Sequence, residues 1–296
     1  MNTEIKNIHL LQYILSYSDT FPKGAVSFGQ KAVKNGGAML LALEDQNPAG
    51  ILILDVPAPQ NYDVAYLYVK PECRNRGIAQ ALLKKACAIA RDEHKMLGLR
   101  VLEEHEAAKA FTRLAGSLQF NKVMTSEIFR CIPTMPKTKE NWSTFLSTRG
   151  NKLCSYLTRR GYHTGPLSEA PEGVRENMIY KFSKNIFPMF SNPFNSKVTD
   201  MNYSFVASKD GEAAAFCTAE AYDGRYILRA LVADKTFQKK GAFILPLIAF
   251  ISKVIENECP LVCYTVYENN RDMLALADGF LTAVTHEVRH QTFYKR

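Results

Sequence analysis

The hydrophobic residues of this chain fall into short runs whose spacing alternates between the periods of strands and helices. Two apolar runs, 38–43 and 49–56, flank a polar turn and predict a β-hairpin. Alternating faces over 63–69 predict a third strand, which Pro71 ends. Apolar residues at helical spacing after Gly77 predict a long helix. The remaining runs of this half predict helical structure over 4–36 with a break at 21–24, a strand at 97–102, a helix at 107–114 and a strand at 125–131.

The second half of the chain repeats this order of elements at a nearly constant offset. Residues 42–45 resemble 207–210 at an offset of 165, and Gly77 corresponds to Gly241 at an offset of 164. An internal duplication predicts this spacing, whereas two unrelated α/β domains with similar turns would produce it only by chance. The predicted elements of the second half are strands at 226–233, 261–266 and 284–293 and helices at 242–255 and 270–277.

The length of the chain, 296 residues, suits two domains, and its 47% apolar content is enough for each to bury a core. Two prolines close to 134–140 mark a linker. We therefore expect an α/β protein of two tandem domains, each a twisted mixed β-sheet flanked by helices. The expected boundaries are 1–133 for the N-terminal domain, 134–140 for the linker and 141–296 for the C-terminal domain.

Charge and cysteine content narrow the class of protein further. The net charge of +8 is spread along the chain, which favours small anionic ligands and argues against nucleic acid as the partner. The seven cysteines have no zinc-binding spacing, so we expect reduced thiols, no metal and a cytoplasmic protein. The apolar stretch 8–15 is too short and too polar to span a membrane, which predicts a soluble protein.

One loop carries most of the chemical signal. A strand ending at Val69 is followed by a basic, glycine-containing turn and then by a helix that begins after Gly77. Unpaired amides at the start of a helix, together with the helix dipole, form an anion site. Arg74 and Arg76 add positive charge for phosphates. The loop lacks the glycine pattern of a P-loop or a dinucleotide fingerprint, and the alternative is an ordinary turn with two solvated arginines.

This segment resembles the phosphate-binding motif of the GNAT N-acetyltransferases. In that family a strand ending in Val-x-Pro is followed by Gln/Arg-x-x-Gly-x-Gly/Ala. The chain matches it with Val69, Pro71, Arg74, Gly77 and Ala79. The resemblance covers about residues 38–131 and, more weakly, 200–294. It implies two tandem GNAT-like domains and an acetyl-CoA-dependent transfer of acetyl to a primary amine of a small molecule or a peptide, by direct attack.

The resemblance also implies where acetyl-CoA binds. Its pyrophosphate would lie on the loop residues Arg74, Asn75, Arg76, Gly77, Ile78 and Ala79. Its pantetheine arm would pair with the end of the preceding strand, at Leu67, Tyr68 and Val69. A backbone N–H near that point would hold the thioester carbonyl.

The catalytic residues are less well marked. Many members of the family carry a glutamate eleven residues before the motif, and this position is Asp63, our candidate general base. The alternative is that Asp63 is a solvated turn residue. The tyrosine that many members use to protonate the leaving thiolate falls at Thr112, or at Ala115 after a one-turn shift. Tyr68, with Tyr66 as the alternative, is our candidate acid, and the thiolate is also able to leave unassisted.

The second copy departs from the motif. Its loop, 238–243, ends in Phe243, where the family has a small residue, and Ile227 takes the position of the carboxylate. We expect a degenerate copy that shapes the acceptor cleft or a homodimer face, and the alternative is that it binds its own coenzyme. The aromatic segments 21–28 and 187–194 are candidate walls of the acceptor pocket.

Three functions follow from these observations. The first is an acetyl-CoA-dependent N-acetyltransferase. The second is a non-catalytic acyl-CoA-binding sensor or interaction protein, which the missing tyrosine and the degenerate second copy favour. The third is a nucleic-acid-binding protein, for which the net charge of +8 is the only motive.

Overall fold

The computed structural model describes residues 3–8, 20–196, 198–222 and 225–296. They form two compact units. Unit 1 is the chain up to Thr125 together with His290–Arg296, and unit 2 is Ser126–Arg289. Each unit combines a β-sheet with helices, so the predicted α/β fold class is confirmed.

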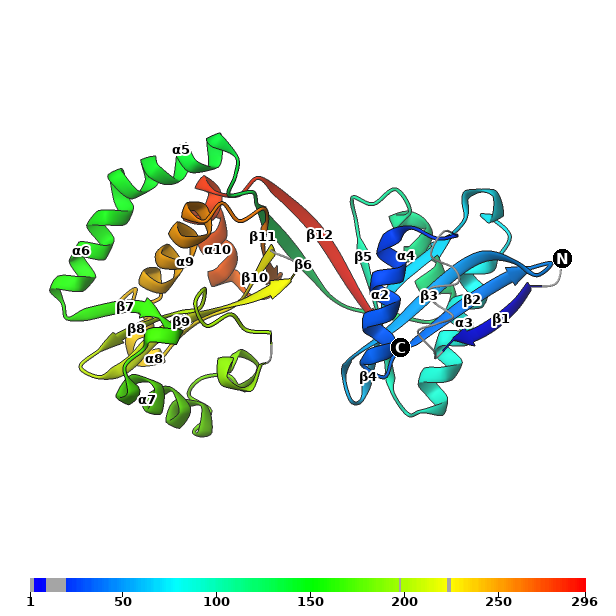
Figure 1. Cartoon of the computed structure of the whole chain (residues 1–296), viewed down its shortest axis with the longest axis horizontal. Coiled ribbons are helices and arrows are strands. Elements are labelled where there is room, and N and C mark those ends of the chain that lie inside the picture. The colour runs from blue at the N-terminus through cyan, green and yellow to red at the C-terminus, as the bar shows by residue number, and fades with distance from the viewer. Residues whose placement is uncertain (1–2, 9–19, 197, 223–224) are drawn as a thin grey trace. The chain divides into compact units, whose positions relative to one another are not determined.

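Unit 1 is built on six strands. They are β1 (Thr3–Ile8), β2 (Ala38–Glu44), β3 (Asn47–Ala58), β4 (Asn61–Val69), β5 (Met96–Leu102) and β12 (Glu287–Lys295). Their order in the sheet is β1-β2-β3-β4-β5-β12 (Figure 1). The first four are antiparallel neighbours, β5 is parallel to β4, and β12 is antiparallel to β5.

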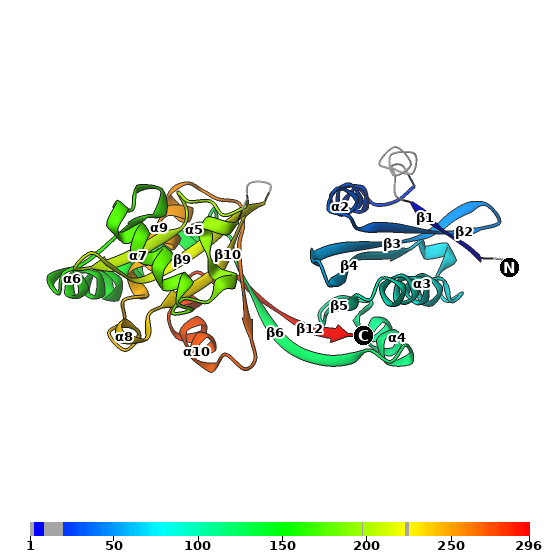
Figure 2. The same cartoon turned by 90° about the horizontal axis from the view of Figure 1, so that it is seen from below.

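Three helices, α2 (Lys23–Lys34), α3 (Ile78–Asp92) and α4 (Ala108–Ser117), cover this sheet. Figure 2 shows α2 on one face and α3 and α4 on the other. Met39 and Leu41 belong to the core under α2, while Leu40 packs with Leu82 and Leu83 of α3. Because both faces are covered, all but the last residue of β2 are buried, and its sequence is a continuous apolar run rather than an alternating one.

Unit 2 has the strand order β6-β11-β10-β9-β8-β7. The strands are β6 (Asn121–Cys131, of which 126–131 lie in unit 2), β7 (Tyr162–Pro166), β8 (Phe205–Lys209), β9 (Glu212–Tyr222), β10 (Arg225–Ala233) and β11 (Val262–Tyr267). The helices are α5 (Pro136–Phe145), α6 (Asn151–Arg159), α7 (Glu172–Ser183), α8 (Lys235–Gln238), α9 (Ile244–Glu256) and α10 (Arg271–Gly279). The core is centred on α9, whose Leu247, Phe250 and Val254 are almost completely buried.

The two halves of the chain repeat one order of elements, as the sequence predicts. The series from β2 to β6 corresponds to the series from β8 to β12, with α3 and α4 matched by α9 and α10. The last strand of each series has been exchanged. β12 pairs with β5 of unit 1 through Gln291–Lys295, and β6 pairs with β11 of unit 2 through Ser126–Cys131.

This exchange makes the observed units differ from the predicted domains 1–133 and 141–296. A division in chain order cannot anticipate that the last strand hydrogen-bonds to β5. The predicted linker, 134–140, overlaps α5, which begins at Pro136. The prediction of helix over 4–36 was wrong at its start, because Thr3–Ile8 forms β1 and pairs with β2. Helix α2 confirms its last part, and residues 9–19 lie outside the described residues.

Candidate active site

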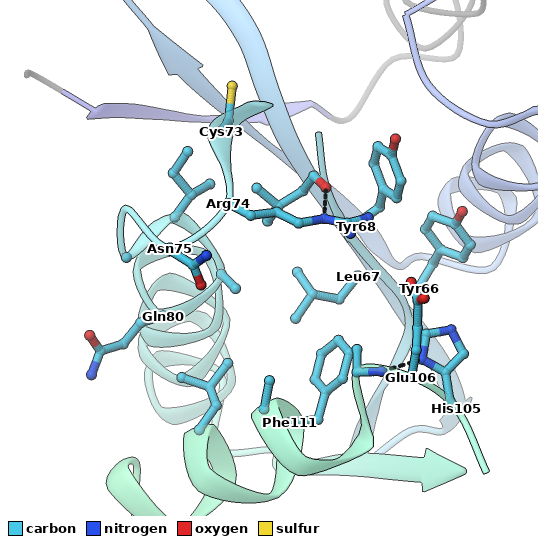
Figure 3. Close-up of a pocket in the computed structure, with 17 residues that line it drawn as sticks. Tyr66, Leu67, Tyr68, Cys73, Arg74, Asn75, Gln80, His105, Glu106 and Phe111 are labelled. Atoms are coloured by element: carbon cyan, nitrogen blue, oxygen red, sulfur yellow. Dashed lines mark hydrogen bonds between the residues drawn. The ribbon is translucent and has the colours of Figure 1, made fainter. Parts of the chain in front are cut away.

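A cavity of about 540 Å³ lies in unit 1, between β4 and the helices α3 and α4 (Figure 3). Strand β4 contributes residues 66–69, and the loop with the first turn of α3 contributes 73–75 and 77–80. The segment that leads into α4 contributes 105–107, and three apolar residues of α4 complete the lining. This volume is within the ordinary range of small-molecule sites. Eight of the nine residues predicted to bind coenzyme line it, and Arg76 is the exception.

The cavity opens where β4 separates from β5. The two strands pair only from Asn61 to Val64 on the β4 side. Further along, the Lys70 N–H donates to the Ala49 carbonyl of β3 at 2.9 Å. Since backbone groups alternate sides along a strand, Leu67 and Val69 direct theirs toward the cavity. This part of β4 therefore offers an edge to which an extended ligand can hydrogen-bond.

The start of α3 supplies unpaired amides to the same cavity. Gly77 caps the helix in the left-handed region, with φ 81°, and no side chain caps it. The first backbone hydrogen bond of the helix runs from the Ala81 N–H to the Gly77 carbonyl at 2.9 Å. Within the described ranges of the chain, the amides of Ile78, Ala79 and Gln80 have no acceptor. With the positive end of the helix dipole, they form an anion site.

The two arginines of the loop have different environments. Arg74 lines the cavity and donates from Nε to the Val69 carbonyl at 3.2 Å, which places its charge over the end of β4. Arg76 does not line the cavity. It forms an ion pair with Glu44 at 3.0 Å and donates to the Glu72 carbonyl at 2.7 Å. Arg76 thus stabilises the conformation of the loop, and its contact with the pyrophosphate stays a prediction.

Asp63, the predicted general base, is not among the cavity-lining residues. Its Oδ2 accepts a hydrogen bond from Arg100 Nη2 at 2.9 Å. Its neighbour across the strands is Gly98, and a Cβ at that position would collide with the Asp63 carboxylate. The structure therefore shows Asp63 in an ion pair on β4, and its role as general base stays a prediction.

Tyr68, the predicted acid, belongs to the cavity strand, but its ring lies on the other face of the sheet. It packs edge-on against Phe21 at 6.2 Å between ring centres, in the core under α2. Tyr66 lies on the same face and stacks on Phe28 at 5.9 Å. Figure 3 shows both rings pointing away from Leu67, which enters the cavity. Burial, reinforced by the nearby Tyr68 phenol, raises the pKa of Tyr66, so this phenol stays protonated.

Helix α4 turns an apolar face to the cavity, through Ala110, Phe111 and Leu114. Thr112 lies instead in a separate hollow together with Val101 and Lys109. Helix α4 therefore brings no hydroxyl group to this cavity. This agrees with the sequence, which has no tyrosine where many members of the family carry one.

His105 and Glu106 line the cavity and were missed by the sequence analysis. They follow the carboxyl end of β5, which is parallel to β4. Ligands of α/β sheets bind at the carboxyl ends of parallel strands, so the position of these residues after a buried strand was the available signal. In Figure 3, Asn75 and Gln80 lie at one end of the cavity, and Tyr66, His105 and Glu106 lie at the other.

The corresponding turn of unit 2 has a different construction. Gly241 keeps the left-handed φ of 75°. However, the Ile244 and Leu245 amides donate to the carbonyls of Gly241 and Ala242 at 3.0 and 3.3 Å. Pro246 has no amide hydrogen. Ala242 is completely buried in the core of unit 2. The first amides of α9 itself, at Ile244 and Leu245, are therefore bonded, unlike the first amides of α3.

The two aromatic segments predicted as acceptor walls, 21–28 and 187–194, differ in their surroundings. Phe28 is 47% exposed and, through its contact with Tyr66, lies next to the cavity strand. Phe187 is completely buried in the core of unit 2. Phe190 is 71% exposed on unit 2. Phe28 thus contacts the cavity strand on the face of the sheet opposite the cavity, whereas Phe187 is a core residue.

The sheet of unit 1 opens between two parallel strands, with a helix start beside the opening. Residues 3–116 match the model of the acetyltransferase (GNAT) family. This part of the chain is thus similar to the GNAT acetyltransferases, and the fold of the chain resembles that of a solved tandem GNAT protein. Members of this family in general bind acetyl-CoA and transfer its acetyl group.

Solved structures share the fold over the whole chain. A tandem GNAT protein from the clavulanic acid biosynthesis pathway is 14% identical, with a TM-score of 0.62, and the match covers 100% of this chain and 98% of that one. A GCN5-related N-acetyltransferase from Sphaerobacter thermophilus is 11% identical, with a TM-score of 0.64 and coverages of 99% and 95%. A glucosamine N-acetyltransferase region of a fungal multi-domain GH3 β-N-acetylglucosaminidase is 10% identical, with a TM-score of 0.66 and coverages of 100% and 38%. No curated protein sequence is significantly similar to the chain.

Three further findings bear on the predictions from composition. None of the described helices is long and apolar enough to cross a membrane. Among the described residues, no group of three or more histidines, cysteines and carboxylates is arranged to hold a metal ion. All seven cysteines are free thiols.

Proposed function

We propose that unit 1 binds acetyl-CoA and transfers its acetyl group to a primary amine, by direct attack of the amine on the thioester. The observation that carries the proposal is one cavity bounded by both an open strand edge, at Leu67 and Val69, and a free helix start, at Ile78–Gln80. The first suits the amide-containing pantetheine arm, and the second suits a pyrophosphate.

The direction of the coenzyme follows from the two ends of the cavity. The pyrophosphate lies at the end with Asn75 and Gln80, where the α3 amides and the Arg74 guanidinium supply positive charge. The pantetheine arm runs along β4, and the acetyl group reaches the end with Tyr66 and His105. A backbone N–H of the open edge at Leu67 donates to the thioester carbonyl oxygen.

The reaction forms one bond and breaks another. The amine nitrogen attacks the thioester carbonyl carbon, a C–N bond forms, and the C–S bond breaks to release the coenzyme as a thiolate. The nitrogen loses a proton, for which Glu106 is the carboxylate among the cavity-lining residues. The acceptor, a small amine or a peptide amine, enters beside Phe28.

Unit 2 is a degenerate copy that binds no coenzyme in this proposal, because the first amides of α9 are already bonded and Pro246 lacks one. Calorimetric titration with coenzyme A should therefore give one site per chain. Two sites per chain would contradict the assignment.

The substitution Gly77→Glu tests the loop, because it places a carboxylate at the proposed pyrophosphate site. Gly36→Glu is the matched control, since Gly36 has φ 80° and, like Gly77, no atom within 4 Å of an added Cβ. Both variants carry the same backbone strain, so we expect them to lose similar stability. Only Gly77→Glu should abolish the rise in Tm that coenzyme A produces. An undiminished rise in Gly77→Glu would refute the coenzyme site.

The second candidate is a non-catalytic acyl-CoA sensor. The ion pair of Asp63 and the apolar face of α4 favour it, because neither offers the acid–base groups that many family members use. Thiol release from acetyl-CoA, measured with polylysine, glucosamine and an amino-acid ester as acceptors, separates the two. Binding of coenzyme with no release above the buffer rate would favour the sensor.

A further inference from the structure

A histidine stands at the acyl end of the cavity with one ring nitrogen already engaged. The Ala107 N–H donates to His105 Nδ1 at 3.1 Å. A nitrogen that accepts a hydrogen bond carries no proton, so the proton of the neutral ring is on Nε2. His105 is therefore fixed as a hydrogen-bond donor at Nε2.

The backbone around His105 also fixes the position of the ring. His105 lies just before α4, and its own carbonyl accepts from the Ala108 N–H at 2.8 Å. The turn into α4 therefore holds the imidazole with Nδ1 toward the Ala107 amide.

The other groups around the cavity leave this role open. Phe111 and Leu114 are the large side chains that α4 presents, and neither has a donor. The rings of Tyr66 and Tyr68 lie on the opposite face of β4, in contact with Phe28 and Phe21. In the described part of the structure, His105 Nε2 has no hydrogen-bond partner.

We infer that His105 Nε2–H donates a hydrogen bond to the coenzyme sulfur as it leaves, in place of the tyrosine that this chain lacks. The inference rests on the proposed acetyl transfer. As the C–S bond breaks, its electron pair goes to sulfur, and the hydrogen bond stabilises the resulting thiolate. His105 keeps its proton, the thiolate is protonated by solvent, and the Glu106 carboxylate receives the proton from the attacking amine.

Two substitutions separate this role from a structural one. His105→Asn retains an oxygen near the position of Nδ1, which can accept from Ala107, but has no donor near Nε2. His105→Gln retains an N–H near Nε2 and loses the acceptor near Nδ1. A donor role predicts that Asn is the damaging change, whereas a role in shaping the turn predicts that Gln is. His163→Asn and His163→Gln, at an exposed histidine of unit 2, are the controls.

The measurements are kcat for thiol release with the acceptors named above, together with the Kd for coenzyme A. Hydrolysis of acetyl-CoA serves as the readout if none of these amines is a substrate, since it releases the same thiolate. Loss of one preorganised donor costs about 10²-fold in kcat. We expect this loss in His105→Asn with an unchanged Kd, and a kcat at least about tenfold higher in His105→Gln.

Each other outcome overturns the inference. An unaffected His105→Asn, a larger loss in His105→Gln, or a parallel loss of coenzyme binding would show that His105 has no donor role. In these cases the parent protein is active, and the proposed function stands. A parent protein that binds coenzyme and releases no thiol in any of the assays would instead refute the proposed function and the inference together.

Discussion

Replacement of Asp63 by asparagine distinguishes the role that the sequence predicts from the one that the structure shows. A general base contributes roughly 10²–10⁴-fold to the rate, so its loss would lower kcat by that factor. The structure instead pairs Asp63 with Arg100 at 2.9 Å, outside the cavity lining. We therefore expect Asp63→Asn to leave kcat unchanged and to lower stability.

The size of the stability loss follows from the exposure of the pair. The Asp63 side chain is 19% exposed and the Arg100 side chain 44% exposed, so solvent screens much of their attraction. We expect a loss of about 1 kcal/mol in the free energy of unfolding. For a unit of this size, that corresponds to a fall of about 2–4 °C in Tm.

The assay combines thiol release from acetyl-CoA with thermal unfolding. Asp92→Asn is the control, because Asp92 is 70% exposed and lies 3.6 Å from an Arg91 that is 80% exposed. This pair should contribute almost nothing to stability. A kcat reduced by about 10² or more in Asp63→Asn, at an unchanged Tm, would show that Asp63 is the base and that the reasoning here is wrong.

Two further predictions concern other parts of the molecule. Burial acts to raise the pKa of Asp234, but hydrogen bonds from Lys181 and Thr236 outweigh it and hold this pKa below its ordinary value. The stability that this pair contributes is thus present above the unfolded pKa of about 3.9 and is lost as pH falls through the lower folded pKa. We expect Asp234→Asn to lower the free energy of unfolding by about 3–5 kcal/mol at pH 7. Its Tm should also depend less on pH below about pH 4 than that of the parent protein, and equal slopes of the two Tm profiles would contradict this prediction. Phe28→Ala removes the ring that stacks on Tyr66 and should raise KM for the amine while the Kd for coenzyme A is unchanged; a change in the coenzyme Kd alone would exclude an acceptor role.

The comparison of α3 with α9 shows how one order of elements gives two different helix starts. Both turns contain a glycine with positive φ, Gly77 and Gly241, and both precede a long apolar helix. The difference lies in the residues that follow. The Gln80 amide in the first turn of α3 has no acceptor, whereas the corresponding Ile244 amide of α9 donates to the Gly241 carbonyl, and the chain continues in tight turns up to Pro246. The same backbone pattern therefore need not preserve the anion site.

Local signals explain why the coenzyme loop was predictable. A strand that ends near Pro71, a glycine at position 77 and apolar residues at helical spacing are all read within about twenty residues of sequence, and the structure has a strand, a turn and a helix at these places. The ion pair of Arg76 was not predictable from local sequence, because its partner, Glu44, is 32 residues away in the sequence. Charge identifies a residue that is able to bind phosphate, but the distribution of carboxylates in space determines whether its charge is free.

Asp63 and His105 also show that local sequence does not reveal the contacts of a side chain. Spacing from the motif placed Asp63 on the correct strand, but the choice between base and ion pair depended on Arg100, which β5 brings alongside. No sequence motif marks His105. Its Nδ1 accepts a hydrogen bond from the Ala107 amide, and only the turn into α4 directs this amide at the ring.

The sequence alone determined the order of strands and helices, the repetition of that order and the position of the turn that opens α3. These features depend on side-chain periodicity and turn residues within short segments, where neighbours in sequence are neighbours in space. Tertiary structure alone decided that β12 pairs with β5, that β4 opens after Val64, and which polar groups face the cavity. Hydrogen bonds between distant strands and ion pairs between distant side chains are fixed by where the chain folds back, and no local pattern encodes that choice.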